Sequence, residues 1–185
     1  PVIGGVGLIT NINNKINQHL KKEGNTIIQI GKNFGQLYQS VFLEEIYSIT
    51  SGPPPEINLS NEKNNGLAVL NLINDKLLSS VHDISSGGLI LALAEMTFKS
   101  GFGLKINKPK NLSNPMEYYF SEDQGRYLIE VEQENLDIVS KILIKNNIYN
   151  EIVGSVQNDF FEIIGELKIS TTDLYKNNNT WYNNF

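Results

Sequence analysis

Residues 82–96, with the sequence HDISSGGLILALAEM, decide the fold of this 185-residue chain. The apolar run Leu77–Val81 just before them is typical of a buried strand. After the two glycines, Leu89, Leu93 and Met96 repeat at helical spacing, and further apolar residues fill the turns between them. The stretch therefore predicts a strand that leads into a helix with apolar residues on nearly every side, and such a helix belongs in the core.

The junction between this strand and this helix is rich in residues that cap or expose backbone groups. Asp83, Ser85 and Ser86 are all good helix N-caps. Gly87 and Gly88 leave free backbone N–H groups at the positive end of a helix dipole, where phosphate often binds. The junction of Ser85, Ser86, Gly87 and Gly88 is therefore a candidate anion-binding site, although ordinary capping and a tight turn explain the same residues.

A second polar group lies between a loop and the strand that begins at residue 126. It consists of Ser121, Glu122, Asp123, Gln124 and Arg126. Two acids and an amide can ligate Mg²⁺ or hydrogen-bond a sugar or amide substrate, and a solvated turn is the alternative. Arg126 is the only arginine of the chain, which fits either a bidentate partner or a carboxylate beside the strand. We predict ligand binding for these five residues and assign no catalytic residue and no metal ligand.

Composition and charge limit the class of protein. Hydrophobic residues make up 40% and charged residues 19% of the chain, as in an ordinary globular domain. The net charge of −5 argues against nucleic-acid binding, which needs a basic face. The absence of cysteine excludes disulfides, thiolate catalysis and cysteine-ligated metals. Without an apolar run long enough to cross a membrane and without a secretory signal, we expect a cytoplasmic protein with neither a nucleic acid nor a membrane as partner.

The remaining periodicities predict an α+β fold, a mixed sheet with helices packed mainly on one face. Predicted strands cover residues 26–30, 104–106 and 126–132, and an antiparallel hairpin joins 152–156 to 160–164. Predicted helices cover residues 36–49, 60–77 and 134–145. In the second of these helices, Leu67, Ala68, Leu70 and Ile73 form the expected apolar face. At the C-terminus, Leu174 and Trp181 are expected to pin the last stretch to the body.

Residues 1–185 are predicted as one domain, with residues 1–9 as a hinge segment that leads into it. The glycines at positions 4, 5 and 7 predict close approach of another backbone in this segment. Because the chain begins at Pro1 within a glycine-rich motif, we expect an excised fragment of a longer multidomain chain.

Three stretches of the sequence resemble one known family. They are PVIGGVG at residues 1–7, HDISSGGL followed by ALAEM at residues 82–96, and FSEDQGRY at residues 120–127. In this order they resemble the C-terminal part of the synthetase subunit of phosphoribosylformylglycinamidine synthase, an AIR-synthase-related C-terminal domain. The sequence departs from the usual family form at Ser86, where relatives have Asp, at Asp123, where they have Ser, and at residues 34–36, where they have a Gly-Gly-Ser turn.

The resemblance implies the fold of that C-terminal domain and a place in an ATP-dependent C–N ligase of de novo purine biosynthesis. The family enzyme converts formylglycinamide ribonucleotide, ammonia from glutamine and ATP into the amidine, ADP and phosphate. ATP and Mg²⁺ would act in the full-length enzyme, while this fragment alone would be structural or complete a ligand site, and inactive. The implied partners are the preceding ATP-binding domains of the same chain and, in a multi-subunit enzyme, a glutaminase subunit and a small bridging subunit.

In the family, the counterpart of residues 121–126 in the first copy of an internal duplication grips the ribonucleotide. This chain resembles the second copy, so its segment would face a pseudo-symmetric, non-catalytic site. The alternatives are another member of the superfamily (aminoimidazole ribonucleotide synthetase, thiamine-phosphate kinase or a hydrogenase-maturation protein) or a non-catalytic nucleotide-binding module.

Overall fold

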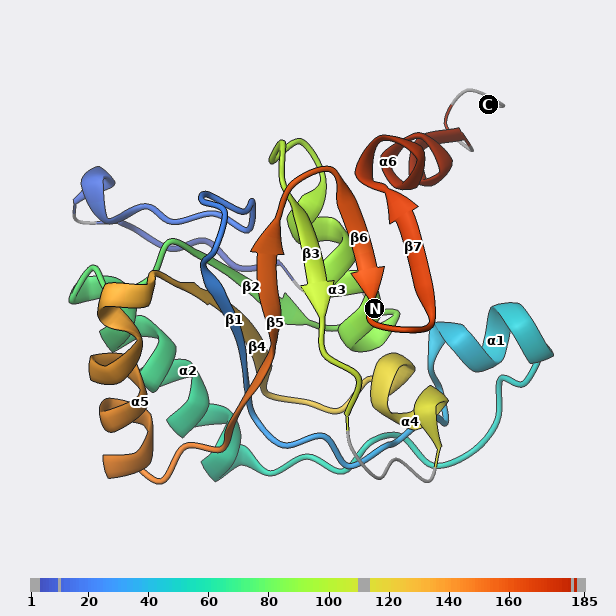
Figure 1. The fold of residues 1–185 in the computed structure, drawn as a ribbon. Coiled ribbons are helices and arrows are strands. Elements are labelled where there is room, and N and C mark those ends of the chain that lie inside the picture. The colour runs from blue at the N-terminus through green and yellow to red at the C-terminus, as the bar shows by residue number, and fades with distance from the viewer. Residues whose placement is uncertain (1–3, 10, 110–113, 181, 183–185) are drawn as a thin grey trace.

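Seven strands form one mixed sheet in the order β2-β4-β1-β5-β3-β6-β7, in a computed structural model that describes residues 4–9, 11–109, 114–180 and 182 (Figure 1). Neighbouring strands are antiparallel except β3 and β6, which are parallel. The strands are β1 (Thr26–Ile30), β2 (Ser80–Ile84), β3 (Gly103–Ile106), β4 (Arg126–Val131), β5 (Asn150–Gln157), β6 (Phe160–Ile163) and β7 (Leu167–Ser170). The helices are α1 (Val41–Tyr47), α2 (Leu59–Asn74), α3 (Gly88–Thr97), α4 (Pro115–Phe120), α5 (Leu136–Lys145) and α6 (Thr171–Asn179), with 3₁₀ turns at Ile12–Asn14 and Gln133–Asn135. The predicted α+β class with a mixed sheet is confirmed.

The central strands place side chains in two separate cores. Ile27 of β1 packs in a core that includes α3 and α4, whereas Ile28 and Ile30 pack in a core that includes α2 and α5. Side chains alternate between the two faces of a strand, and all five residues of β1 are buried. Both faces of this strand therefore need cover, so the helices do not lie mainly on one face as the sequence analysis expected.

Helix α3 is buried as its sequence predicts. The side chains of Leu89, Leu93 and Met96 have no exposed surface. The strand before it starts at Ser80 rather than at Leu77, so the junction begins only after Ile84. This edge strand pairs along its whole length with β4.

The predicted hairpin of residues 152–156 and 160–164 is wrong. Strand β3 lies between β5 and β6 and is hydrogen-bonded to both. Neighbouring strands lie about 4.8 Å apart, so the short link from Gln157 to Phe160 is long enough to pass over one strand. Gly103 makes this passage fit, since a Cβ there would collide with the backbone of Phe160. The Gln157 amide then donates to the carbonyls of Leu104 and Phe160, both at 3.0 Å, and fastens the link.

Several helix boundaries also differ from the prediction. Helix α2 begins at Leu59 with Asn58 as its N-cap, and it buries Ala68, Val69 and Leu72. Two residues of the predicted apolar face, Leu67 and Leu70, are 46% and 50% exposed. The helix is therefore rotated relative to the predicted face.

Helix α1 is shorter than predicted, and α4 and β7 were not predicted; α6 lies in the last stretch, which Leu174 was expected to pin. The predicted helix at 134–145 divides into a 3₁₀ turn and α5. Leu174 packs against the first core as expected, while Trp181 lies outside the described residues.

The segment 4–9 has no helix or strand and is exposed. No atom lies within 4 Å of a Cβ placed at Gly4, Gly5 or Gly7, so the expected close backbone approach is not found in these residues.

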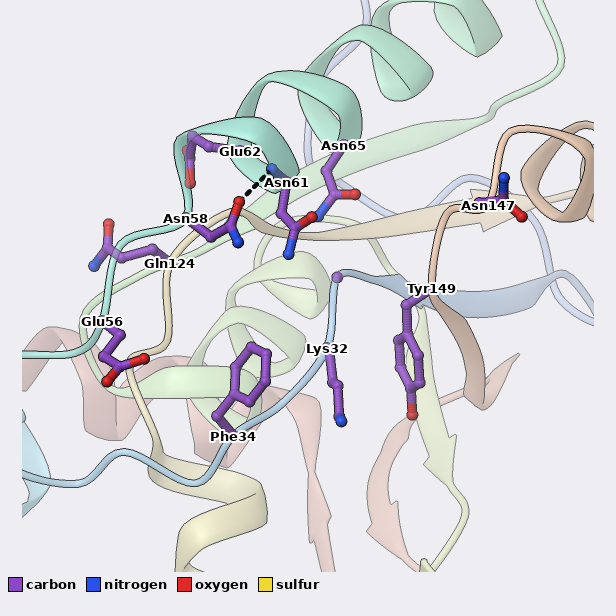
Figure 2. A pocket seen from close by; sticks show the side chains of 11 residues that line it. Lys32, Phe34, Glu56, Asn58, Asn61, Glu62, Asn65, Gln124, Asn147 and Tyr149 are labelled. Atoms are coloured by element: carbon purple, nitrogen blue, oxygen red, sulfur yellow. Dashed lines mark hydrogen bonds between the residues drawn. The ribbon is translucent and has the colours of Figure 1, made fainter.

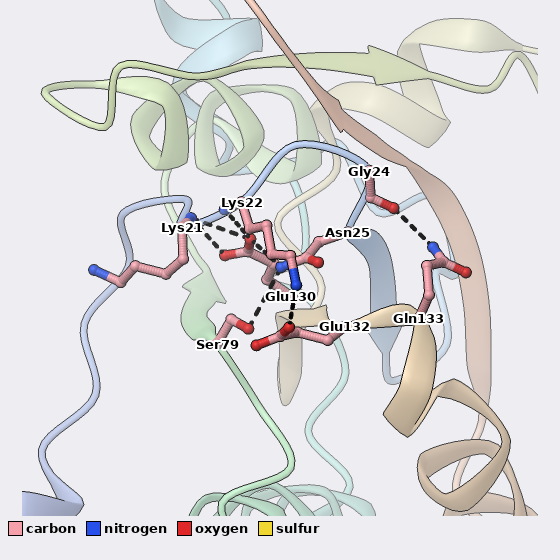
Figure 3. A network of polar contacts seen from close by, with 8 residues as sticks. All are labelled: Lys21, Lys22, Gly24, Asn25, Ser79, Glu130, Glu132 and Gln133. Atoms are coloured by element: carbon pink, nitrogen blue, oxygen red, sulfur yellow. Dashed lines mark hydrogen bonds and ion pairs between the residues drawn. The ribbon is translucent and has the colours of Figure 1, made fainter.

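The buried carboxylate of Glu130 fastens residues 21–25 to the sheet (Figure 3). Glu130 has no exposed surface, and its carboxylate accepts hydrogen bonds from the backbone N–H groups of Lys21 and Lys22 at 3.1–3.2 Å. It also accepts from the Asn25 amide at 2.8 Å and the Ser80 hydroxyl at 2.7 Å. A buried charge is tolerated only where such donors replace water.

Candidate functional site

The two candidate sites of the sequence meet in the structure. Gly88 packs against the segment between α4 and β4, where a Cβ on Gly88 would lie 2.6 Å from the Ser121 carbonyl oxygen. Its φ of +70° and the φ of +79° at Gly87 belong to the left-handed region that favours glycine. The double glycine therefore allows the start of α3 to touch the loop that carries the second motif.

The start of α3 already holds a negative charge from the chain itself. Its N-cap is Gly87, which makes no side-chain capping bond, while Ser85 and Ser86 are exposed. Instead, the Oε1 atom of Glu122 accepts the Gly87 N–H at 2.8 Å and the N–H of Val41, the first residue of α1, also at 2.8 Å. One carboxylate thus joins two helix N-termini, where negative charge is stabilised. An anion at this helix start would compete with the Glu122 carboxylate for the Gly87 N–H.

Asp123 makes a similar bond to another loop. Its side chain is 3% exposed, and its Oδ2 accepts the N–H groups of Phe34 and Gly35 at 3.0 and 3.1 Å. Asn33 completes this contact, since its Oδ1 accepts the Ser121 hydroxyl at 3.1 Å and its amide donates to the Tyr118 carbonyl at 2.8 Å. Asp123 and Ser121 therefore order the loop after β1.

Arg126 holds the same segment from inside. Its guanidinium is buried and donates to the backbone carbonyls of Ser121 and Asp123. Burial lowers the pKa of Arg126, while the neighbouring Asp123 charge acts in the opposite direction. Its Nη1 has no hydrogen-bond partner among the described residues. The planar fork suits two carbonyls at fixed angles, which explains why lysine does not replace it.

Gln124 of the predicted group lines a cavity in the part of the chain that the structure describes (Figure 2). The cavity holds about 200 Å³ and lies between the end of β1, the start of α2 and the start of β5. Its other lining residues are Gly31, Lys32, Phe34, Glu56, Asn58, Asn61, Glu62, Asn65, Asn147 and Tyr149. Figure 2 shows the amides of α2 on one side and the rings of Phe34 and Tyr149 with Lys32 on the other. Such a lining suits a small ligand with several hydrogen-bonding groups.

Sequence reasoning missed most of this cavity. Asn58, the N-cap of α2, and Asn61 and Asn65 within the helix recur at spacings of three and four, so they lie on one side of it. That polar periodicity was a usable signal on a different face from the predicted apolar one. The contributions of Lys32 and Tyr149 had no such signal, because they come from segments more than 100 residues apart.

The imidazole of His82 lies between two carboxylates. Its Nε2 is 2.8 Å from Glu95 Oε2, and its Nδ1 is 3.3 Å from Asp83 Oδ1. The hydroxyl of Ser121 is directed to Asn33 and not to this histidine. Within residues 4–9, 11–109, 114–180 and 182, no three His, Asp or Glu side chains lie close enough together to hold a metal ion. Helices in these same ranges are all too short or too polar to cross a bilayer.

Comparisons with known proteins give one consistent family. Residues 22–165 match the family model described as AIR synthase related protein, C-terminal domain. The whole chain is 44% identical to the phosphoribosylformylglycinamidine synthase subunit PurL of Pelagibacter ubique (strain HTCC1062), of which it covers 25%. The chain thus spans about a quarter of the length of the curated relatives it matches.

Two solved structures share the fold at low sequence identity. Thermotoga maritima PurL complexed with FGAR has a TM-score of 0.71 at 16% identity, over 89% of this chain and 30% of that one. The same protein complexed with ATP has a TM-score of 0.67 at 15% identity, over 89% of this chain and 28% of that one. These likenesses concern the arrangement of helices and strands.

Proposed function

We propose a function from the following premise: the chain belongs to the family of AIR synthase related proteins, C-terminal domain. It acts as the C-terminal domain of the ATP-dependent synthetase that converts formylglycinamide ribonucleotide and ammonia to the amidine in purine biosynthesis. The observation that carries this proposal is the 44% identity to a phosphoribosylformylglycinamidine synthase subunit over all 185 residues. Residues 1–185 are then one domain, with residues 1–9 as the hinge segment.

The geometry supports a bracing role for the two motifs. Glu122, Asp123 and Arg126 form hydrogen bonds with the chain's own backbone. They therefore hold α1, α3 and the loop after β1 in place. Gln124 remains open to a ligand beside this braced segment. We therefore propose that the domain completes a ligand site at its border with preceding domains, with Gln124 as the contact and its neighbours as supports.

The nucleotide would be bound mainly outside this domain. The Thermotoga maritima protein complexed with ATP supports nucleotide binding in the longer chain, and Mg²⁺ would accompany that ATP. Within this chain, the start of α3 is a poor fit for a triphosphate, since Glu122 already accepts its N–H. The phosphates would therefore be bound by the preceding ATP-binding domains.

The partners follow from the same assignment. The Pelagibacter relative is named as a subunit, which supports a complex with a glutaminase subunit and a small bridging subunit. A cytoplasmic location agrees with this role. A different superfamily enzyme remains the alternative, and substrate specificity of the longer chain decides between them.

The test is an assay of the isolated chain against the longer one. The 185-residue chain, mixed with ATP, Mg²⁺, ammonia and formylglycinamide ribonucleotide, should release no ADP above background. The Pelagibacter ubique subunit serves as the positive control. Turnover by the isolated chain would overturn the bracing role, and turnover of the longer chain only with aminoimidazole-type or thiamine-type substrates would overturn the assigned reaction.

A further inference from the structure

An apolar groove lies on the side of the domain that carries α1. It holds about 390 Å³, and its surface consists of apolar atoms. Residues from six elements form its walls, among them Phe42 and Ile46 of α1, Leu91 of α3, Phe120 of α4 and Leu167 of β7. Water-exposed apolar surface of this kind usually marks a place where another protein surface packs.

The groove is built firmly rather than left by a loose loop. Phe42 of α1 stacks on Phe120 at the end of α4, with ring centroids 4.4 Å apart. The Glu122 carboxylate fixes α1 against α3 through Val41 and Gly87, and both of these residues line the groove. The groove therefore has a defined shape before anything binds, and it adjoins the braced motifs.

The exposure of α1 is large for so short a helix. Ile46 is 65% exposed and Tyr47 is 59% exposed, and Leu167 on β7 across the groove is 46% exposed. Among the described residues, Glu45 is the one charged residue of the lining, so a small polar ligand would find too few groups here to orient it, because binding pockets need several placed polar groups. The surface fits the apolar side of a folded polypeptide.

The segment that leads into the domain points to the origin of that polypeptide. Val6, Leu8 and Ile9 are 103%, 97% and 64% exposed, and a Cβ placed at the neighbouring glycines would have no atom within 4 Å. Like the apolar surface of the groove, these apolar side chains are exposed to solvent in the isolated chain. About three quarters of the length of the matched relatives lies outside the residues of this chain.

We infer that the groove between α1, α3 and β7 is the docking face for the apolar surface of the preceding part of the same, longer polypeptide. The inference rests on the proposed function, because that function supplies the longer chain. Docking at this groove would bury α1 and set the braced motif of Glu122 and Asp123 at the border between the two parts.

The experiment compares two matched surface substitutions in the longer synthase chain that carries this domain. Ile46→Lys places a charge in the groove, while Ile144→Lys places one on α5, where the isoleucine is 69% exposed and outside the groove. A charge in an apolar contact costs enough to open the docked state at least about tenfold more often. Limited proteolysis at residues 4–9 should accordingly be about tenfold faster with Ile46→Lys and unchanged with Ile144→Lys.

A second variant and the isolated chain complete the test. Leu167→Lys, across the groove, should accelerate cleavage as Ile46→Lys does. In the isolated 185-residue chain, both groove variants should leave the midpoint of thermal unfolding unchanged, which separates docking from folding. Equal cleavage rates for Ile46→Lys and Ile144→Lys in the longer chain would overturn the inference. So would a dimer of the isolated chain that Ile46→Lys dissociates, since a second copy would then occupy the groove.

The proposed function and the docking face fail separately. If the longer chain lacks synthetase activity but Ile46→Lys still accelerates cleavage, the function is wrong and the docking face stands. If the longer chain is active and the groove variants behave like the control, the docking face is wrong and the function stands.

Discussion

Near the end of strand β4, Glu130 is closed off from solvent, whereas just before the start of the strand, Glu122 is half-buried beside a groove. Both carboxylates accept backbone N–H groups of distant segments. Glu130 has donors from two residues of one loop and from two side chains, so nothing else can reach it. Glu122 joins two helix starts and remains accessible from the side. The same chemistry therefore fastens the chain at one end and shapes a surface for other molecules at the other.

The largest loss of stability should come from a change at Gly88, which packs the start of α3 against the segment just before β4. Gly88→Ala places a Cβ 2.6–2.8 Å from backbone atoms of residues 119–121, which cannot move like a side chain. We expect a loss of more than about 4 kcal/mol in the free energy of unfolding, measured with urea. Gly101→Ala is the matched control, because Gly101 has a similar φ of +79° but open space around it. It should cost only the strain of about 1–2 kcal/mol, and equal losses for both variants would mean that close packing is not the reason for Gly88.

The next largest loss of stability should come from a change at the buried Glu130, near the end of β4. Glu130→Gln exchanges one acceptor oxygen for an NH₂ group that faces donors, and it removes the charge on which these hydrogen bonds depend. We expect a loss of about 3 kcal/mol in the free energy of unfolding and faster hydrogen exchange at residues 21–25. Glu134→Gln, four residues later and exposed, is the control and should leave stability unchanged. A stability loss for Glu130→Gln no larger than that of the control would mean that the buried network contributes nothing.

A change at the half-buried Glu122, just before β4, should cost less stability and should create an anion-binding site. Glu122→Ala frees the N–H groups of Gly87 and Val41, and we expect a loss of about 1–2 kcal/mol, because water can replace part of the contact. The freed helix start of α3 should then accept an external anion. Inorganic phosphate should raise the thermal unfolding midpoint of Glu122→Ala but not of the unchanged chain. Equal stabilisation of both would mean that residues 85–88 bind anions without displacing Glu122.

The sequence predicted what depends on neighbouring residues. The apolar repeat of Leu89 and Leu93 was enough to place α3 in the core, and the β-branched run at Thr26–Ile30 gave β1 with its bounds. A local signal was overlooked in α4, where Asn114 caps a helix that has Pro115 at its first position. No helix or strand was predicted for these residues.

Contacts between distant segments were not predictable in this way. Glu130 looks like the solvent-facing residue of an alternating strand, and its donors lie between 50 and 109 residues earlier. The short link of Asn158 and Asp159 favours a hairpin, but a strand from residues 103–106 inserts between its arms. The candidate sites were found as motifs, whereas their contact through Gly88 and Glu122 needed the fold.

The smallest effect on stability should come from Gln124, and it is the most informative for function. Gln124 is exposed, and its amide makes only a 3.5 Å contact with the Glu122 carbonyl. Gln124→Ala should therefore change the free energy of unfolding by less than about 0.5 kcal/mol. In the longer synthase chain, any change in KM for a substrate or in affinity for a nucleotide would then report a lost ligand contact and not a damaged fold. Asn71→Ala, at an exposed position of α2 that does not line this cavity, is the control. If Gln124→Ala alters neither KM nor kcat, the cavity beside the braced motif holds no ligand of the reaction, and both ends of β4 serve only to fasten the chain.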